Sequence, residues 1–149
     1  MIVHKAGEII PEVVEVDQSS RKDQKPFEMI DKCPVCHEPL ERKPGEADYY
    51  CTNDQCPGKH INRLIHFSSR VAMDIDTLGE KVVETLHELG FLNTIADIYT
   101  LKDHEDDLKG LPGFADKKVE KLLNAIEDSK KQSFDKLIFG LGIKHVGAK

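Results

Sequence analysis

The chain has 149 residues, a net charge of −6 and a charged fraction of 32%. This length allows one ordinary domain or two small ones, and the negative charge argues against a surface that coats nucleic acid uniformly. No apolar run reaches the roughly 18 residues of a membrane helix, and the first residues lack the basic-then-apolar order of a signal peptide. We therefore expect a soluble cytoplasmic protein with no membrane partner.

The first 16 residues predict a β-hairpin or strand pair, with Gly7 as the turn signal. Two strands cannot bury a core alone, so we expect this piece either to pack on a neighbour or to be the end of a larger sheet. Residues 17–31 are polar and aperiodic, which is typical of a linker. The apolar residues of the predicted strands are Ile2, Val3, Ile9, Ile10, Val13, Val14 and Val16.

From residue 59 onward, apolar residues recur at helical spacing and glycines separate the segments, so the fold class is predicted to be mainly α. The acidic run at 103–107 is interpreted as a solvated face or a helix start. The predicted helices lie near 61–68, 82–89 (ended by Gly90), 94–99 (capped by Asn93 or Thr94) and 103–109, then from Ala115, and around Phe134, Leu137 and Ile138.

All four cysteines lie within residues 32–58, as Cys33-x2-Cys36 and Cys51-x4-Cys56. Two such pairs can present four thiolates to one Zn²⁺, and a segment this polar needs a metal to be stable. Four thiolates leave no open coordination position, so we predict one structural zinc per chain. A thiol–disulfide pair and an iron centre are the alternatives; the first lacks the α/β context of such enzymes.

Three glycine-containing turns follow, each with apolar anchors and a lysine just after it. They are "IDTLGEK", "LKGLPGFADKK" and "FGLGIKHVGAK", about thirty residues apart, which indicates an internal repeat of a helix pair. Glycine-rich backbone at a helix start exposes N–H groups to an anion, so each turn is predicted to bind a DNA backbone phosphate. An ordinary helix connection is the alternative, strongest for the first turn. The predicted contacts are Gly79, Lys81, Gly110, Gly113, Lys117, Gly142, Lys144, Gly147 and Lys149.

Together these segments resemble the C-terminal half of the bacterial NAD-dependent DNA ligases. The resemblance rests on the cysteine spacing, on the run "CTNDQCPGKHINRLIHFSSRVAMDIDTLGEK", and on "LPGFADKKVEKLLNAIEDSKK" and "LIFGLGIKHVGAK". It covers nearly the whole chain. It implies the end of an oligonucleotide-binding (OB) barrel at 1–16, a four-cysteine zinc finger at 32–58 and a helix-hairpin-helix DNA-binding domain at 59–149.

The resemblance also implies a function in DNA replication and repair. In this family an N-terminal domain forms a lysine–AMP intermediate at a Lys-x-Asp-Gly motif, which this sequence lacks. We therefore expect an internal fragment that cannot ligate alone, with NAD and Mg²⁺ bound in domains outside it. The fragment would grip nicked duplex DNA in the minor groove without sequence preference, as a monomer associated with the bacterial nucleoid. By analogy Lys5 and Gly7 would help the barrel hold DNA near the nick.

One departure from the family pattern concerns the second turn, where Ala115 stands in place of a third glycine. This turn is expected to be slightly less open. A second hypothesis makes the chain a zinc-stabilised helical module that docks another DNA-repair protein. A third makes it a redox protein that uses the cysteines.

Overall fold

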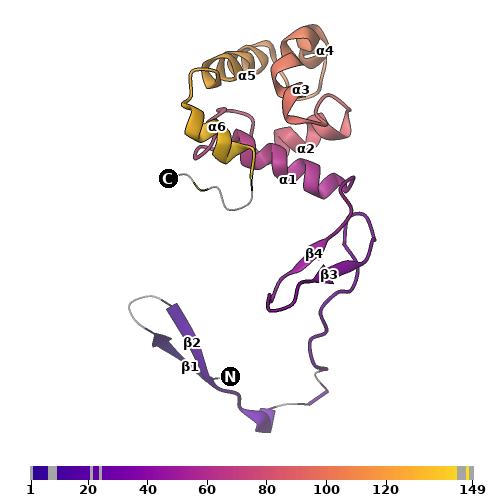
Figure 1. The fold of residues 1–149 in the computed structure, drawn as a ribbon, viewed down its shortest axis with the longest axis vertical. Helices are drawn as coiled ribbons and strands as arrows, with labels where there is room; N and C mark the ends of the chain where they lie inside the picture. Colours follow the sequence, from indigo (N-terminus) through magenta and orange to yellow (C-terminus); the bar gives the residue numbers. More distant parts are fainter. Residues whose placement is uncertain (1, 7–9, 21, 24, 144–146, 148–149) are drawn as a thin grey trace. The chain divides into compact units, whose positions relative to one another are not determined.

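The computed structural model describes residues 2–6, 10–20, 22–23, 25–143 and 147. The chain separates into two compact units, residues 1–30 and 31–149. Figure 1 shows the strands and helices of each unit along the chain. The mainly α class is confirmed, because helices account for far more of the second unit than its two short strands do.

The first unit is an antiparallel hairpin of β1 (Ile2–Ala6) and β2 (Ile10–Glu15), followed by the short 3-10 helix η1 (Gln18–Ser20). Val3 lies opposite Val13 in the hairpin register. Every residue of β2 is exposed, so alternation along the strand does not produce a buried face. The hairpin has apolar side chains but, among its described residues, buries none of them.

The second unit begins with the cysteine segment. An isolated bridge between Lys32 and Pro39 leads into β3 (Leu40–Arg42), which pairs antiparallel with β4 (Tyr49–Cys51). Gly45 adopts φ +81°, a left-handed conformation that glycine reaches without steric cost, at the turn between the two strands.

The rest of the second unit consists of short helices (Figure 1). α1 contacts α2, α3 and α6, and α5 contacts α3 and α4. The helices are α1 (Pro57–Ser68), α2 (Glu80–Glu88), α3 (Ile95–Thr100), the 3-10 helix η2 (Leu101–His104), α4 (Glu105–Lys109), α5 (Asp116–Ser129) and α6 (Phe134–Gly140).

Local signals account for most helix boundaries. Thr94 begins α3 with a capping box, in which the carboxylate of Asp97 accepts hydrogen bonds from the amides at the start of the helix. Gly90 follows α2 at φ +82° and ends it. The segment predicted as one helix at 103–109 is instead divided between η2 and α4. Phe134, predicted to lie on an apolar face, is 73% exposed because it starts α6 at the surface.

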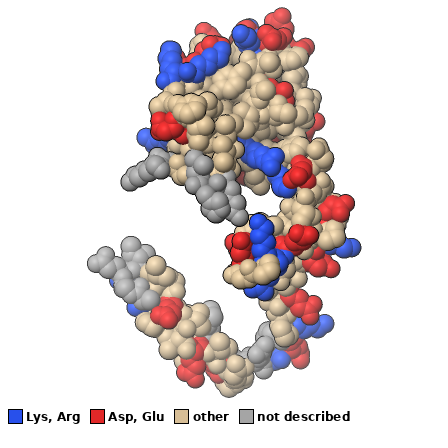
Figure 2. Space-filling model, in the orientation of Figure 1, with Lys and Arg blue, Asp and Glu red and all other residues tan. Residues whose placement is uncertain are grey.

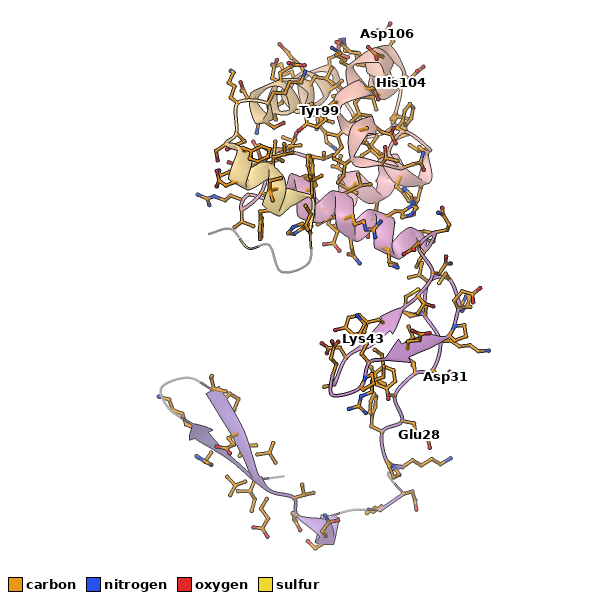
Figure 3. All side chains as sticks on the ribbon, viewed as in Figure 1. Glu28, Asp31, Lys43, Tyr99, His104 and Asp106 are labelled. Atoms are coloured by element: carbon orange, nitrogen blue, oxygen red, sulfur yellow. The ribbon has the colours of Figure 1, made fainter. Side chains whose placement is uncertain are left out.

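The core of the second unit is a single cluster of aliphatic side chains around Phe67. α1 supplies Leu64 and Phe67, α2 supplies Leu86 and α5 supplies Leu122, each no more than 1% exposed. Tyr99 on α3 (Figure 3) reaches the end of α5, where its hydroxyl is 3.2 Å from that of Ser129. These contacts fix the orientation of the turns that separate the helices.

Candidate metal centre and phosphate-binding turns

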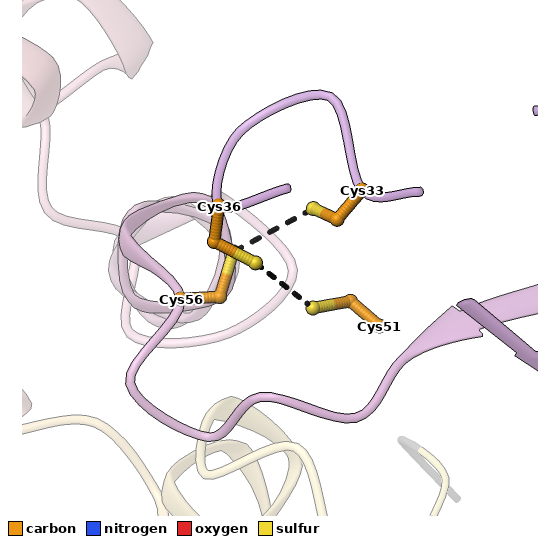
Figure 4. Close-up of side chains that lie close together, drawn as sticks. All are labelled: Cys33, Cys36, Cys51 and Cys56. Atoms are coloured by element: carbon orange, nitrogen blue, oxygen red, sulfur yellow. Dashed lines mark hydrogen bonds between the residues drawn. The ribbon is translucent and has the colours of Figure 1, made fainter. Parts of the chain in front are cut away.

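The Sγ atoms of Cys33, Cys36, Cys51 and Cys56 all lie within 4.8 Å of one another (Figure 4). The Cys33–Cys56 pair is 3.9 Å apart and the Cys36–Cys51 pair is 3.5 Å apart. A tetrahedral zinc with Zn–S near ~2.3 Å requires sulfur atoms about 3.8 Å apart. The four sulfur atoms therefore fit one zinc ion with a closed coordination sphere, as predicted.

The chain positions these sulfur atoms by turns rather than by a core. The amide of His37 donates to the carbonyl of Cys33 at 2.9 Å, and the amide of Cys33 donates to that of Glu38 at 2.8 Å. His37 adopts φ +61°, which closes the turn of residues 33–38, called the knuckle below. Cys51 ends β4, and Cys56 is the N-cap residue of α1. One ligand is thus built directly into the start of the helical domain.

The pKa values of the thiols show that a metal ion must displace protons from this site. Backbone N–H groups of Cys36 and Val35 lower the pKa of Cys33 to about 6. Burial and the neighbouring Cys36 raise the pKa of Cys51 to about 12. The protein environment alone therefore does not ionise all four groups at neutral pH, so zinc binding must displace protons from this site.

The knuckle also packs against α1. A Cβ atom added to Gly58 would lie 3.1 Å from a methyl group of Val35, so this position accepts only a very small residue. The imidazole Nε2 of His60 lies 2.9 Å from the carbonyl of Asp54, and Lys59 forms an ion pair with the Asp54 carboxylate at 2.9 Å. His60 is therefore part of this junction.

The first and second turns have the same backbone structure. The amide of Leu78 donates to the carbonyl of Ile75 at 3.2 Å, and that of Phe114 donates to Leu111 at 3.1 Å. The residue before each anchor is left-handed, with φ +73° at Thr77 and φ +80° at Gly113. The structure therefore aligns the two turns with an offset of 36 residues, the separation of Lys81 from Lys117.

This alignment pairs Gly79 with Ala115, the N-cap residues of α2 and α5. Each N-cap carbonyl accepts the amides three and four residues later. The amides of Gly79, Glu80 and Lys81 do not donate to other described residues. The same holds for Ala115, Asp116 and Lys117 in the described part of the chain. Both helix starts therefore offer backbone donors to an external anion.

The lysines beside these helix starts have no ion-pair partner among the described residues. Lys81 and Lys117 are exposed, and no carboxylate of the described chain lies within salt-bridge distance of either. Lys109, Lys121 and Lys130 all form ion pairs. Lys81 and Lys117 are thus available to an external anion.

An ion pair brings the first turn next to the helix that follows the second. Asp76 in the first turn is 2.8 Å from the ammonium group of Lys121 on α5, which lowers the pKa of Asp76. Lys117 lies one helical turn before Lys121, so both share one face of α5. The first turn therefore lies close to the first half of α5.

Two of the predicted glycine contacts have a different local role. The amide of Gly110 donates to the carbonyls of Asp106 and Asp107, and the amide of Gly142 donates to that of Phe139. Both glycines follow the last turn of the preceding helix and their amides are already bonded, so the prediction that these amides are open donors is wrong. Gly147 is exposed, with no atom within 4 Å of an added Cβ.

The remaining predicted contacts are placed as follows. Lys5 is exposed on β1, opposite Pro11. Gly7, Lys144 and Lys149 lie outside the described residues.

Sequence reasoning missed two features of the turns. The ammonium group of Lys118 donates to the carbonyl of Gly113 at 3.0 Å and lies 4.2 Å from the centre of the Phe114 ring. These two contacts of Lys118 stabilise the second turn. The hydroxyl of Thr77 is buried and makes no hydrogen bond with any described residue. Neither feature has a residue signature, since each depends on which way the turn folds.

Comparisons with known proteins agree with this geometry. The family model of the NAD-dependent DNA ligase C4 zinc finger domain matches residues 32–57, which contain all four cysteines. Over all 149 residues the chain is 67% identical to a DNA ligase of Acholeplasma laidlawii. The chain is homologous to one part of these DNA ligases, and its cysteine segment belongs to the zinc finger family of the NAD-dependent ones. The chain is also 48% identical to a DNA ligase of Onion yellows phytoplasma, and 51% identical over 99% of its length to one of Natranaerobius thermophilus.

The chain spans 22 to 23% of the length of these relatives. The four cysteines, brought within reach of one ion, form the single structural zinc site that the finger family implies. Among its described helices, none has the length and apolar character needed to cross a membrane.

Proposed function

We propose that this chain is a non-catalytic DNA-binding part of an NAD-dependent DNA ligase that holds nicked duplex DNA through backbone phosphates in the minor groove. The observation that carries the proposal is the pair of matching turns. Each combines three open amides at a helix start with a lysine that has no ion-pair partner among the described residues, and the Asp76–Lys121 ion pair holds the first turn close to α5, the helix that follows the second. Such sites bind phosphates irrespective of base sequence.

Charge is placed locally rather than as a broad basic surface. Figure 2 shows Lys and Arg interleaved with Asp and Glu over the helical part of the molecule. With a net charge of −6, long-range attraction to DNA is weak, so affinity rests on a few defined contacts. If about five cations reach phosphates, log K should fall against log salt with a slope of roughly −4 to −5.

The proposed contacts are the helix starts at Gly79 and Ala115 with Lys81 and Lys117, continued by the third turn. In the whole ligase, a domain that uses NAD and Mg²⁺ would transfer AMP to the 5′-phosphate at the nick. Attack of the 3′-hydroxyl on that phosphorus would form the phosphodiester and release AMP. The present chain would hold the duplex during these steps, as a monomer in the bacterial cytoplasm near the nucleoid.

The exposed hairpin in residues 1–30 fits the same proposal. Ile10 is 71% exposed and Val14 is 58% exposed, which leaves apolar surface for the rest of an OB barrel to cover. Lys5 and Gly7 would then face DNA near the nick. Exposed apolar residues also favour the second candidate, a zinc-stabilised module that docks another repair protein.

Binding of the chain to a fluorescein-labelled nicked duplex, measured by anisotropy across a salt series, tests the proposal. We expect Lys81→Gln and Lys117→Gln each to weaken binding on any sequence and to reduce the salt slope by about 0.9. Lys131→Gln is the matched control, because Lys131 is equally charged but paired with Asp128 far along α5. Equal effects of all three substitutions would contradict phosphate contacts at the turns.

A chain that binds no nicked duplex even at low salt would favour the docking module instead. The same substitutions placed in a longer ligase chain separate that outcome from weak binding by a short one. There, loss of nick sealing in the Lys117→Gln variant but not in the Lys131→Gln variant would support the DNA-binding function.

A further inference from the structure

A hollow of about 350 Å³ lies between α1 and the end of α6. α1 contributes Asn62, Arg63 and His66, and the other wall is Gly140–Gly142. His66 is four residues after Asn62 and three after Arg63, so it lies beside each of them on the surface of α1. Figure 1 shows α6 lying alongside α1.

The charge of this hollow differs from that of two others in the described chain. Asp54 lines the one beside the zinc finger, and Asp74 and Asp76 line the one at the first turn. The hollow at α6 has Arg63 and no described carboxylate on its wall. Arg63 also borders the hollow beside the zinc finger, but Asp54 there is already paired with Lys59. The pKa of Asp54 is lowered mainly by Lys59 and to a smaller extent by the charge of Arg63. Arg63 is nevertheless exposed and forms no ion pair with the described residues, so its guanidinium is open to an anion.

The wall opposite Arg63 is held in place by His66. Its Nε2 lies 2.9 Å from the carbonyl of Phe139. A carbonyl only accepts, so Nε2 carries the proton and the imidazole ties α6 to α1. The His66 ring also packs on that of Phe139, with centroids 4.9 Å apart. The hollow is therefore formed before any ligand arrives.

Glycine keeps the floor of the hollow open. Gly142 adopts φ +65°, and a Cβ at this position would lie 3.8 Å from the His66 ring. A side chain here would be strained and would project into the space next to the imidazole. The ligand must therefore be compact and approach the backbone closely.

We propose that this hollow binds a phosphate group, with Arg63 as its principal ligand and the side-chain amide of Asn62 as a second donor. A guanidinium offers planar paired N–H groups that match two phosphate oxygens. The ligand in the ligase is a phosphodiester of the duplex, one step along the backbone from the turns. This inference rests on the proposed function and adds α1, the helix that begins at the zinc site, to the DNA-binding surface.

Two measurements test it. The first is the affinity of Arg63→Gln for nicked duplex, with Lys59→Gln as the control on the same helix. Lys59 is already paired with Asp54, and both substitutions change the net charge by the same amount. We expect Arg63→Gln to weaken binding by about fivefold or more and to lower the salt slope by about 0.9, and Lys59→Gln to change affinity less than about twofold. Arg63→Lys should restore only part of the loss, because ammonium is not forked.

The second measurement is an amide NMR titration of the chain with inorganic phosphate. Saturable shifts at Asn62, Arg63 and Leu141–Gly142 that vanish in Arg63→Gln would support the site independently of DNA. Equal weakening of duplex binding by Arg63→Gln and Lys59→Gln would overturn it while leaving the proposed function intact. If the chain binds no duplex, the proposed function fails, and the phosphate titration alone decides: absence of localised shifts then refutes the hollow as a phosphate site.

Discussion

Thr77→Gly is expected to stabilise the helical domain. Thr77 adopts φ +73° and its buried hydroxyl has no partner among the described residues, whereas the aligned position in the second turn is Gly113. The left-handed conformation costs a threonine about 1–2 kcal/mol, and the unpaired hydroxyl costs about 1–3 kcal/mol. Glycine loses more backbone entropy on folding than threonine, which offsets about 0.5–1 kcal/mol of this gain. From the lower ends of the two costs, the net gain in unfolding free energy is about 1–1.5 kcal/mol.

Thermal and urea unfolding of the zinc-loaded protein measures this gain, which corresponds to about 4–8 °C in Tm for a unit of this size. Thr77→Ala separates the two contributions, because alanine removes the hydroxyl but keeps the strain, so it should recover roughly half of the gain. Nicked-duplex affinity should stay unchanged, since the amides from Gly79 to Lys81 are not altered. A Thr77→Gly variant no more stable than the parent, or no more stable than Thr77→Ala, would refute the strain argument.

Three further outcomes follow. A zinc chelator should abolish the ordered amide NMR signals of residues 32–58 while those of the helices persist. Zinc affinity, measured by competition with a chromophoric chelator, should fall from pH 8 to pH 6 because protons compete with zinc for the thiolates. Persistence of the finger without metal would contradict a structural zinc. Asp76→Asn should tighten duplex binding about two- to fivefold by removing a negative charge and freeing Lys121, with little change in Tm because the pair is exposed; unchanged or weaker binding would place the first turn away from DNA. Gly140→Ala should lower the unfolding free energy by about 1–3 kcal/mol, because the added Cβ would lie 3.2 Å from the Phe67 ring in the core. An unchanged unfolding free energy in urea would show that α6 shifts freely to make room.

Features encoded by local spacing were predictable from the sequence. The zinc ligands follow from two cysteine pairs, and the α3 cap follows from Thr94 and Asp97. The alignment of one repeat with the next was harder to predict, because the glycines that mark the turns in the sequence do not occupy equivalent positions. The repeating feature is a left-handed residue two positions before the helix N-cap, and Thr77 fills that position without any glycine signature.

Tertiary features were not predictable from one sequence. Gly110 reads as part of a glycine-rich turn, yet its amide completes the end of α4. The hollow at Arg63 exists only because α6 returns to α1, where Phe139 meets His66 across 73 residues of chain. Nothing in the helical periodicity of α1 distinguishes Arg63 from Lys59, and only their different neighbours do.

Cys56 is at once a zinc ligand and the residue on which α1 begins. No residue separates the zinc ligand from the helix, so the finger cannot rotate independently of α1. One residue inserted after Cys56 would rotate the helix by about 100° and advance it by about 1.5 Å relative to the metal. The length of this junction, rather than its composition, therefore sets the angle at which finger and helices can meet a common partner.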